Sequence, residues 1–240
     1  MKITIRPMTI EEAWNLLMNN HSMYHKKLKH YKYGYNAFIP LTDDFKEMFE
    51  KENLTQQDIE HYKNIFATKI YDVKKLQRLD NIVENQVKPE FEQVVNKYLV
   101  PLIPSWNAIM PKELQIWCSF GCGSNYLRKS DDLAVMPFRM SRYPDDPTKI
   151  LNVMFHEFVH MLIQEPIILK YDVPQDLKER IVDLICYEFI KKPVQLMFEK
   201  SFANAYITPD AIKKDLPGAV AKMMADYRAM QLAKQSGISK

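Results

Sequence analysis

Residues 145–164 read DDPTKILNVMFHEFVHMLIQ and decide how the second half of the chain folds. Asp146 before Pro147 is typical of a helix start, because an aspartate caps free backbone N–H groups and a proline fits the first turn. The residues that follow are mostly apolar, and they surround His156 and His160 on both sides. We therefore predict a largely buried helix that runs to the end of this stretch.

Strands are predicted on the N-terminal side of this helix. ELQIWCSF (113–120) and DLAVMPFRM (132–140) are rich in strand-forming residues, and a turn-rich segment joins them. At the start of the chain, KITIR (2–6) alternates as a short strand. Thr9 with Glu12 three residues later forms a capping box, which predicts that a helix follows this strand. The chain should therefore contain a small sheet.

The rest of the chain is predicted to be helical. Apolar residues recur at helical spacing between residues 41 and 98, in two or three long segments. Asp172, with Gln175 three residues on, predicts another helix that runs to about Ile190. Shorter helices are predicted at 208–215 and 218–234.

Taken together, these elements predict an α+β chain with two regions. Residues 1–100 should be mainly helical, and residues 101–240 should hold the small sheet, the buried helix and the C-terminal helices.

Composition and charge exclude several classes of protein. The chain has 240 residues, 47% of them hydrophobic, which suits a globular protein. Its net charge of +3 is too small to indicate a dedicated nucleic-acid binder. No stretch reaches the length of a membrane-spanning helix, and the N-terminus lacks the apolar run of a secretion signal. The three cysteines, an odd number, suit a reducing compartment, so we expect a cytoplasmic protein without a disulfide framework.

The chemistry is predicted from His156-Glu157-Phe158-Val159-His160, an HExxH pattern inside the predicted helix. Two residues four apart on a helix project about 40° apart and lie one turn along the axis, so both imidazoles can reach one metal ion. Glu157 projects beside them and can take a proton from a metal-bound water without being a ligand. We therefore predict one Zn²⁺ per chain, held by His156 and His160, with Glu157 as general base.

A catalytic zinc site needs a third protein ligand, and histidine is excluded downstream. All six histidines lie at or before residue 160, and Ile163 and Pro166 stand where a metzincin would have its glycine and third histidine. Glu179 and Asp183 stand out among the downstream carboxylates, because they lie four apart on the next predicted helix and share a face. That helix is mostly apolar, so its carboxylates need polar partners.

These residues resemble the active-site signature of gluzincin metallopeptidases, the group of thermolysin and aminopeptidase N. HEFVH is followed by 18 residues and then by Glu179 and Asp183, which is similar to the HExxH-x18-ExxxD pattern. The resemblance covers residues 156–183 and implies Glu179 as the third ligand, with Asp183 orienting His156. It also implies that residues 101–240 are a zincin-like metallopeptidase region and that the substrate is a peptide or a protein.

The chain departs from the family's pattern in two respects. No GxMEN-like segment precedes the helix, so an aminopeptidase activity is not supported. No histidine follows that could stabilise an oxyanion, so a tyrosine would have to do so. Tyr206 and Tyr227 are the candidates, although packing in the core explains either one more simply.

The resemblance also implies where a substrate binds. In the family, the strand nearest the active-site helix is the sheet edge that pairs with an extended substrate. Residues 132–140 are expected to form that edge here. The predicted reaction is hydrolysis of a peptide bond by a metal-activated water, with Glu157 as general base.

Two other functions stay open at this point. The chain could be a catalytically silent module stabilised by zinc. It could also be a nucleic-acid-associated interaction protein, because residues 24–35 mix basic and aromatic side chains; a solvated helix end explains that segment more simply. Two carboxylates are given ordinary roles: Asp172 caps a helix and Glu165 is solvated. Cys118 and Cys122 are too few for a zinc finger, and they should lie in a strand and its following turn.

Overall fold

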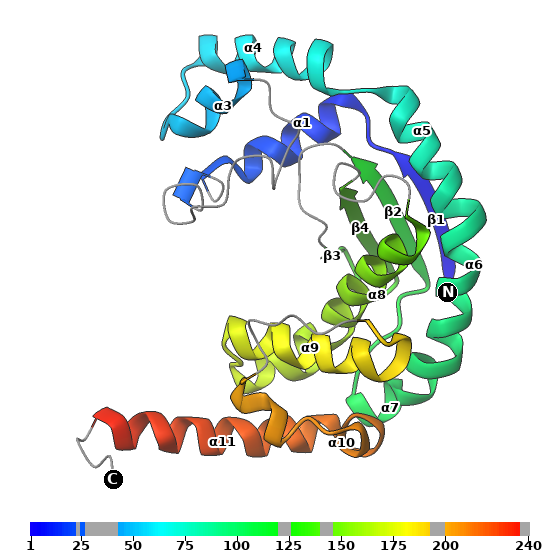
Figure 1. Ribbon diagram of the computed structural model, residues 1–240, viewed down its shortest axis with the longest axis vertical. Coiled ribbons are helices and arrows are strands. Elements are labelled where there is room, and N and C mark those ends of the chain that lie inside the picture. The colour runs from blue at the N-terminus through cyan, green and yellow to red at the C-terminus, as the bar shows by residue number, and fades with distance from the viewer. Residues whose placement is uncertain (23–24, 27–42, 120–125, 140–145, 193–199, 236–240) are drawn as a thin grey trace.

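The described part of the computed structural model comprises residues 1–22, 25–26, 43–119, 126–139, 146–192 and 200–235. Within it the protein is an α+β structure, with one four-stranded sheet and many helices (Figure 1). None of the described helices combines the length and apolar character needed to cross a membrane.

The sheet has the strand order β1-β2-β4-β3. Its strands are β1 (Lys2–Pro7), β2 (Glu113–Ser119), β3 (Leu127–Arg128) and β4 (Leu133–Arg139). β2 runs parallel to β1 and to β4, whereas β3 runs antiparallel to β4. The predictions of strands at 2–6, 113–120 and 132–140 are therefore confirmed.

The expectation that residues 132–140 form the edge of the sheet is wrong. β4 lies between β2 and β3, and the short β3 is the edge strand. Consistent with an inner position, residues 134–138 of β4 are all buried. An unbroken apolar run is typical of such a strand, which is covered on both faces. In β2 the burial of the side chains alternates instead. Leu114, Ile116 and Cys118 face the core, and the residues between them are half-buried.

Helices make up most of the remaining described chain. The N-terminal set is α1 (Ile10–Asn19), α3 (Asp43–Glu50), α4 (Gln56–Ile65), η2 (Phe66–Ile70), α5 (Val73–Ile82), η3 (Val83–Val87), α6 (Lys88–Val94), η4 (Val95–Leu99), η5 (Val100–Leu102) and α7 (Ile103–Trp106). The C-terminal set is α8 (Pro147–Ile163), η7 (Gln164–Leu169), α9 (Gln175–Ile190), η9 (Phe202–Ala205), α10 (Pro209–Lys214) and α11 (Leu216–Gln235).

Prolines account for several wide turns within these helices. The π-helical turns η3 and η4 each come just before a proline, Pro89 and Pro101, and η7 contains Pro166. A proline inside a helix lacks the N–H donor and crowds the preceding turn, and the backbone can accommodate it by widening that turn. The chain from α5 to α7 therefore continues as one long curved path around the sheet (Figure 1).

The sheet and the helices share one buried core. α5 packs on β1 and β2, and α8 packs on β4, η3 and α6. The other side of α8 contacts α9, so α8 lies between the sheet and the C-terminal helices (Figure 1). β1 comes from the N-terminal region and pairs with β2, so the two regions expected from the sequence contribute to the same sheet.

Local capping signals position α1 and α8 as predicted, but not α9. Thr9 and Glu12 form the predicted capping box, and the Asp146 side chain accepts a hydrogen bond from the Lys149 N–H. Asp172 is not a cap, and this prediction was wrong. It has a left-handed backbone (φ 55) at the end of the preceding turn, and α9 begins after Pro174.

Candidate metal centre

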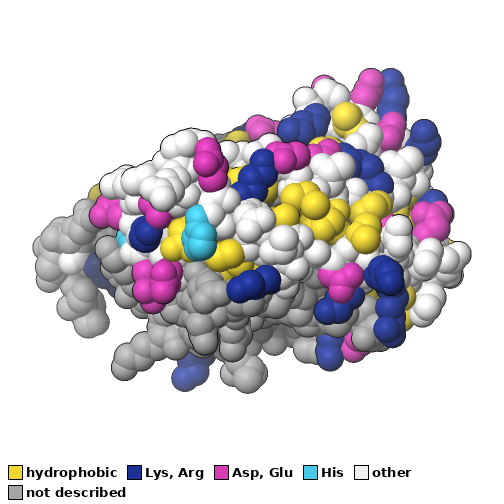
Figure 2. Space-filling model, turned by 90° about the horizontal axis from the view of Figure 1, so that it is seen from above, with side chains coloured by type: hydrophobic (Ala, Val, Ile, Leu, Met, Phe, Trp, Pro, Cys, Tyr) yellow, Lys and Arg dark blue, Asp and Glu magenta, His cyan; other side chains and the backbone are white. Residues whose placement is uncertain are grey.

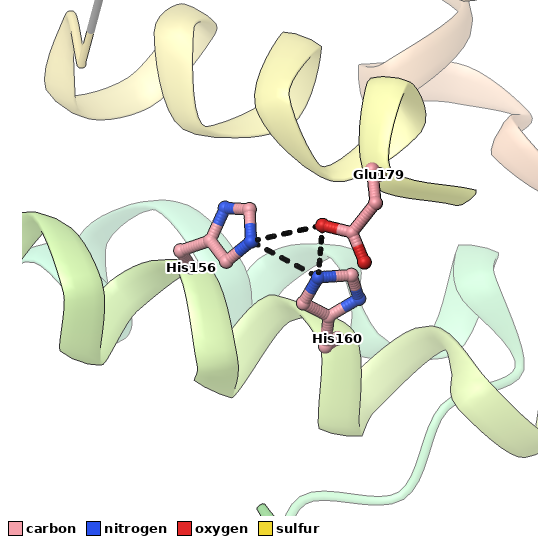
Figure 3. A group of neighbouring side chains, drawn as sticks. All are labelled: His156, His160 and Glu179. Atoms are coloured by element: carbon pink, nitrogen blue, oxygen red, sulfur yellow. Dashed lines mark hydrogen bonds and ion pairs between the residues drawn. The ribbon is translucent and has the colours of Figure 1, made fainter. Parts of the chain in front are cut away.

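Three side chains converge between α8 and α9. His156 and His160 lie one turn apart on α8, and Glu179 reaches them from the first turns of α9 (Figure 3). Both histidines are buried, with 8% and 3% of their surface exposed, although they carry polar rings. The packing of α9 on α8 therefore brings together the two histidines of the motif and the carboxylate that the family resemblance implied.

The distances between these three side chains fit the ligand set of one small cation. The Nε2 atoms of His156 and His160 are 3.0 Å apart, and they lie 3.4 and 3.2 Å from Oε2 of Glu179. Ligand atoms bound tetrahedrally at about 2.0–2.1 Å would lie roughly 3.3 Å from one another. Two imidazole nitrogens and one carboxylate oxygen are also a donor set that zinc accepts. The group could therefore hold a metal ion.

The surroundings of this group favour an ionised Glu179 and a neutral His160. Burial opposes ionisation of Glu179, but hydrogen bonds with His156 and His160 hold its pKa well below the usual value. Burial lowers the pKa of His160, and its contact with Glu179 only partly offsets this effect. A metal ligand set requires carboxylate and neutral imidazole, so these are the protonation states that a cation would need.

Glu157 lies beside the metal ligands without joining them. Burial, followed by the nearby charge of Glu179, raises its pKa to about 8. Within the described part of the chain, no group donates a hydrogen bond to its carboxylate, whereas the oxygens of Glu179 are held by His160 and by Gln175. Glu157 is therefore available to exchange a proton with a molecule bound next to it.

Asp183 and Lys192 both lie near Nδ1 of His156, the ring nitrogen that faces away from Glu179. One carboxylate oxygen of the fully buried Asp183 is 3.6 Å from Nδ1 of His156, which is longer than a hydrogen bond. The Lys192 Nζ is 2.8 Å from the same Nδ1 and 3.3 Å from the same Asp183 oxygen. Lys192 therefore contacts both of the side chains that the sequence had paired.

Tyr126 is a neighbour of the site that the sequence did not predict. Its ring stacks on His160, with centroids 6.1 Å apart and planes 15° apart, and its hydroxyl donates to Oε1 of Gln164 at 2.7 Å. Burial, and then the charges of Glu157 and Glu179, raise its pKa to about 12, so the phenol is a neutral donor. It lies just before β3, in a turn-rich segment with no periodic pattern that could have indicated it.

The two tyrosines that were predicted from the sequence lie together on C-terminal elements. Tyr206 follows η9 and Tyr227 lies on α11, and both rings pack against Phe202. The hydroxyl of Tyr206 donates to Asp226 at 2.8 Å. In the described residues, neither tyrosine contacts the two histidines or Glu179, whereas Tyr126 contacts His160.

Other residues considered in the sequence have ordinary surroundings. Glu188 is the second glutamate of α9 and lies near its C-terminal end. It pairs with Lys213 on α10 and faces away from the histidines. Glu165 is exposed, as predicted. Cys118 is a free buried thiol in β2, and Cys122 lies outside the described residues.

An open hollow lies beside the edge strand. Its volume is about 500 Å³, and it is lined by the turn after β3, by Arg128 and by Glu165 and Pro166 of η7. The Lys129 N–H donates to the Leu133 carbonyl of β4. Hydrogen-bonded and non-hydrogen-bonded residue pairs alternate along an antiparallel ladder. The N–H and C=O of Arg128, the preceding residue, therefore face away from β4. The outer edge of the sheet and this hollow are thus next to each other.

Comparisons of the chain with family models, with curated proteins and with solved structures returned no match. The function is therefore inferred from the site itself.

Proposed function

We propose that the protein is a zinc-dependent peptidase with a zincin-like catalytic region of the gluzincin kind. One observation carries the proposal: His156, His160 and Glu179 direct three ligand atoms to one point, and Glu157 lies next to them with an unengaged carboxylate. Structural zinc sites are usually closed by four protein ligands, whereas catalytic sites use three and leave a position for water. Three ligands and an adjacent base are the set that catalysis requires.

In this proposal each protein group has a separate task. His156, His160 and Glu179 would hold the ion, and zinc, when bound, acidifies a water molecule and polarises a carbonyl group. Glu157 would accept a proton from a water molecule as the water oxygen bonds to the peptide carbonyl carbon, since no described group competes for its carboxylate. It would then give that proton to the amine nitrogen as the C–N bond breaks, as a general base that becomes a general acid.

The substrate would be an extended peptide that pairs with the outer edge of β3. The backbone of Arg128 faces that edge, and the hollow of about 500 Å³ beside it would receive substrate side chains. Tyr126 lies directly before β3, and its ring stacks on His160. Its phenol therefore replaces Tyr206 and Tyr227 as our candidate for stabilising an oxyanion.

The alternative of nucleic-acid binding receives less support. Residues 24 and 27–35 of the basic and aromatic segment lie outside the described residues, and His25 is buried with Nδ1 bonded to the Phe49 carbonyl. On the face shown in Figure 2, described Lys and Arg side chains lie among Asp and Glu side chains. Mixed charges of this kind do not form the basic footprint of a nucleic-acid site. A cytoplasmic location stays a prediction from the cysteine count.

The proposal is tested by metal removal and replacement. The protein is stripped with a chelator, and cleavage of a diverse peptide mixture is followed by mass spectrometry before and after one equivalent of zinc is added. We expect cleavage to stop on stripping and to return with zinc. Full zinc binding without any cleavage would instead support the silent zinc-stabilised module, and salt-sensitive nucleic-acid affinity would support the interaction protein.

A further inference from the structure

The Lys192 side chain contacts the Nδ1 edge of the His156 ring, on the opposite side of the ring from the Nε2 atom that faces His160 and Glu179. Its Nζ is 2.8 Å from Nδ1 of His156 and 3.3 Å from Oδ1 of Asp183. The three side chains are little exposed, at 17% for Lys192, 10% for His156 and 0% for Asp183. A cation in this place is unexpected, because the outer nitrogen of a metal-binding histidine usually donates its proton to a carboxylate, a carbonyl group or water.

The hydrogen bond from Lys192 fixes which nitrogen of His156 carries a proton. An ammonium group has only donors, so Nδ1 must accept from it. In a neutral imidazole the proton then lies on Nε2, which points at Oε2 of Glu179, 3.4 Å away. A metal ion, however, needs the bare lone pair of Nε2 and therefore the proton on Nδ1. Lys192 and a metal ion thus require opposite tautomers of His156.

We propose that Lys192 competes with the metal ion for His156 and so weakens metal binding. When the ion is held, Nδ1 carries the proton and Asp183 accepts it, since its oxygen is already 3.6 Å away. Lys192 must then release Nδ1 and keep only its contact with Asp183. The site is therefore built for exchangeable metal and not for permanent metal. This inference rests on the metal-binding part of the proposed function and needs no peptidase activity.

A simpler role for Lys192 makes the opposite prediction. If the lysine served only to neutralise the buried Asp183, removing it would take a favourable charge away from a buried carboxylate. The variant Lys192→Met would then lose stability without binding metal more tightly. Competition instead predicts that the metal-free protein loses stability while its affinity for metal rises. The two measurements move in opposite directions only if Lys192 opposes the metal.

The experiment measures zinc affinity by competition with a chromophoric chelator, for the wild type, Lys192→Met and Lys191→Met. Lys191 is the matched control, since it is the adjacent lysine, is exposed and, among the described residues, contacts the Glu188 carbonyl and the Tyr187 ring. We expect Lys192→Met to bind zinc on the order of 10-fold more tightly, the size of effect seen for outer partners of metal ligands. Lys191→Met should match the wild type. Unchanged or weaker binding by Lys192→Met overturns the proposal.

A second measurement reads the tautomer directly in the metal-free protein. Nitrogen NMR of histidine-labelled protein should show the Nε2 proton on His156 of the wild type, and a shift toward the Nδ1 form in Lys192→Met. An Nδ1 proton in the wild type overturns the proposal even if zinc binds. Zinc binding without peptide cleavage would contradict the proposed function alone, whereas zinc binding by neither protein would overturn both.

Discussion

Zinc should raise the thermal stability of the protein, and His160→Ala should abolish that effect. His160 supplies one of the three converging ligand atoms, and its Nε2 lies 3.0 Å from that of His156 and 3.2 Å from Oε2 of Glu179. A ligand that binds only the folded state stabilises it in proportion to the logarithm of its concentration relative to Kd. Removing His160 leaves two ligands, so the same zinc concentration should become ineffective.

The size of the shift follows from this linkage. At a free zinc concentration of 100 times Kd, the free energy of unfolding should rise by about 2.7 kcal/mol. For a chain of this length, each kcal/mol moves Tm by about 2–4 °C, so the wild type should gain roughly 5–11 °C. If the variant binds 100-fold more weakly, the gain falls to about 0.4 kcal/mol, or roughly 1–2 °C.

Differential scanning fluorimetry with and without zinc measures both shifts. The shift is compared and not Tm itself, because removing a buried imidazole also lowers the stability of the metal-free protein. His61→Ala is the matched control, since His61 is exposed on α4 and its ring contacts that of Tyr62 in the described part of the chain. It should keep the full shift. An equal zinc shift in His160→Ala and in the wild type would refute the assignment of His160 as a ligand.

Three further predictions follow from the same contacts. Glu179→Ala should bind zinc far more weakly in a competition titration, whereas Glu188→Ala, which loses only an ion pair with α10, should bind it normally. Asp183→Asn should cost about 10- to 100-fold in zinc affinity, measured in the same titration, and an unchanged value would remove Asp183 from the site. Arg6, first, and then Thr9 lower the pKa of Glu12 to about 2, so its contribution to stability is present above the unfolded pKa of about 4.3 and is lost as pH falls toward 2. Between pH 5 and pH 2 the wild type should therefore lose more stability in urea titrations than Glu12→Gln. The difference should stay under about 1 kcal/mol, because the side chains of Arg6 and Glu12 are each over one third exposed. Equal losses in the two proteins would contradict this prediction.

Features set by local interactions could be predicted from the sequence. The helix that carries His156 and His160 begins where its capping residues indicated and spans the apolar stretch, because each signal acts within a few residues, and it continues directly into η7. The spacing on the next helix likewise placed Glu179 and Asp183 on one face and Glu188 on another. The family resemblance then suggested which carboxylate meets the histidines.

Features that depend on tertiary packing could not be predicted in this way. Lys192 lies nine residues after Asp183, so an ideal helix would place it about 180° away. It reaches His156 because α9 ends at Ile190 and Lys191 takes a left-handed conformation, which turns the chain back. Similarly, β4 lies inside the sheet because it pairs with β3. β3 is only two residues long, so the sequence of β4 does not reveal this pairing.

The central claim is tested most directly by comparing peptide cleavage by the zinc-loaded wild type, Glu157→Gln and Glu165→Gln. The first variant keeps the shape of the side chain beside the ligands but removes the base. The second makes the same change at an exposed glutamate a few residues beyond the motif. With zinc content shown equal in all three, we predict cleavage by the wild type and by Glu165→Gln and none by Glu157→Gln. Equal cleavage by Glu157→Gln, or no cleavage by the wild type, would contradict the account.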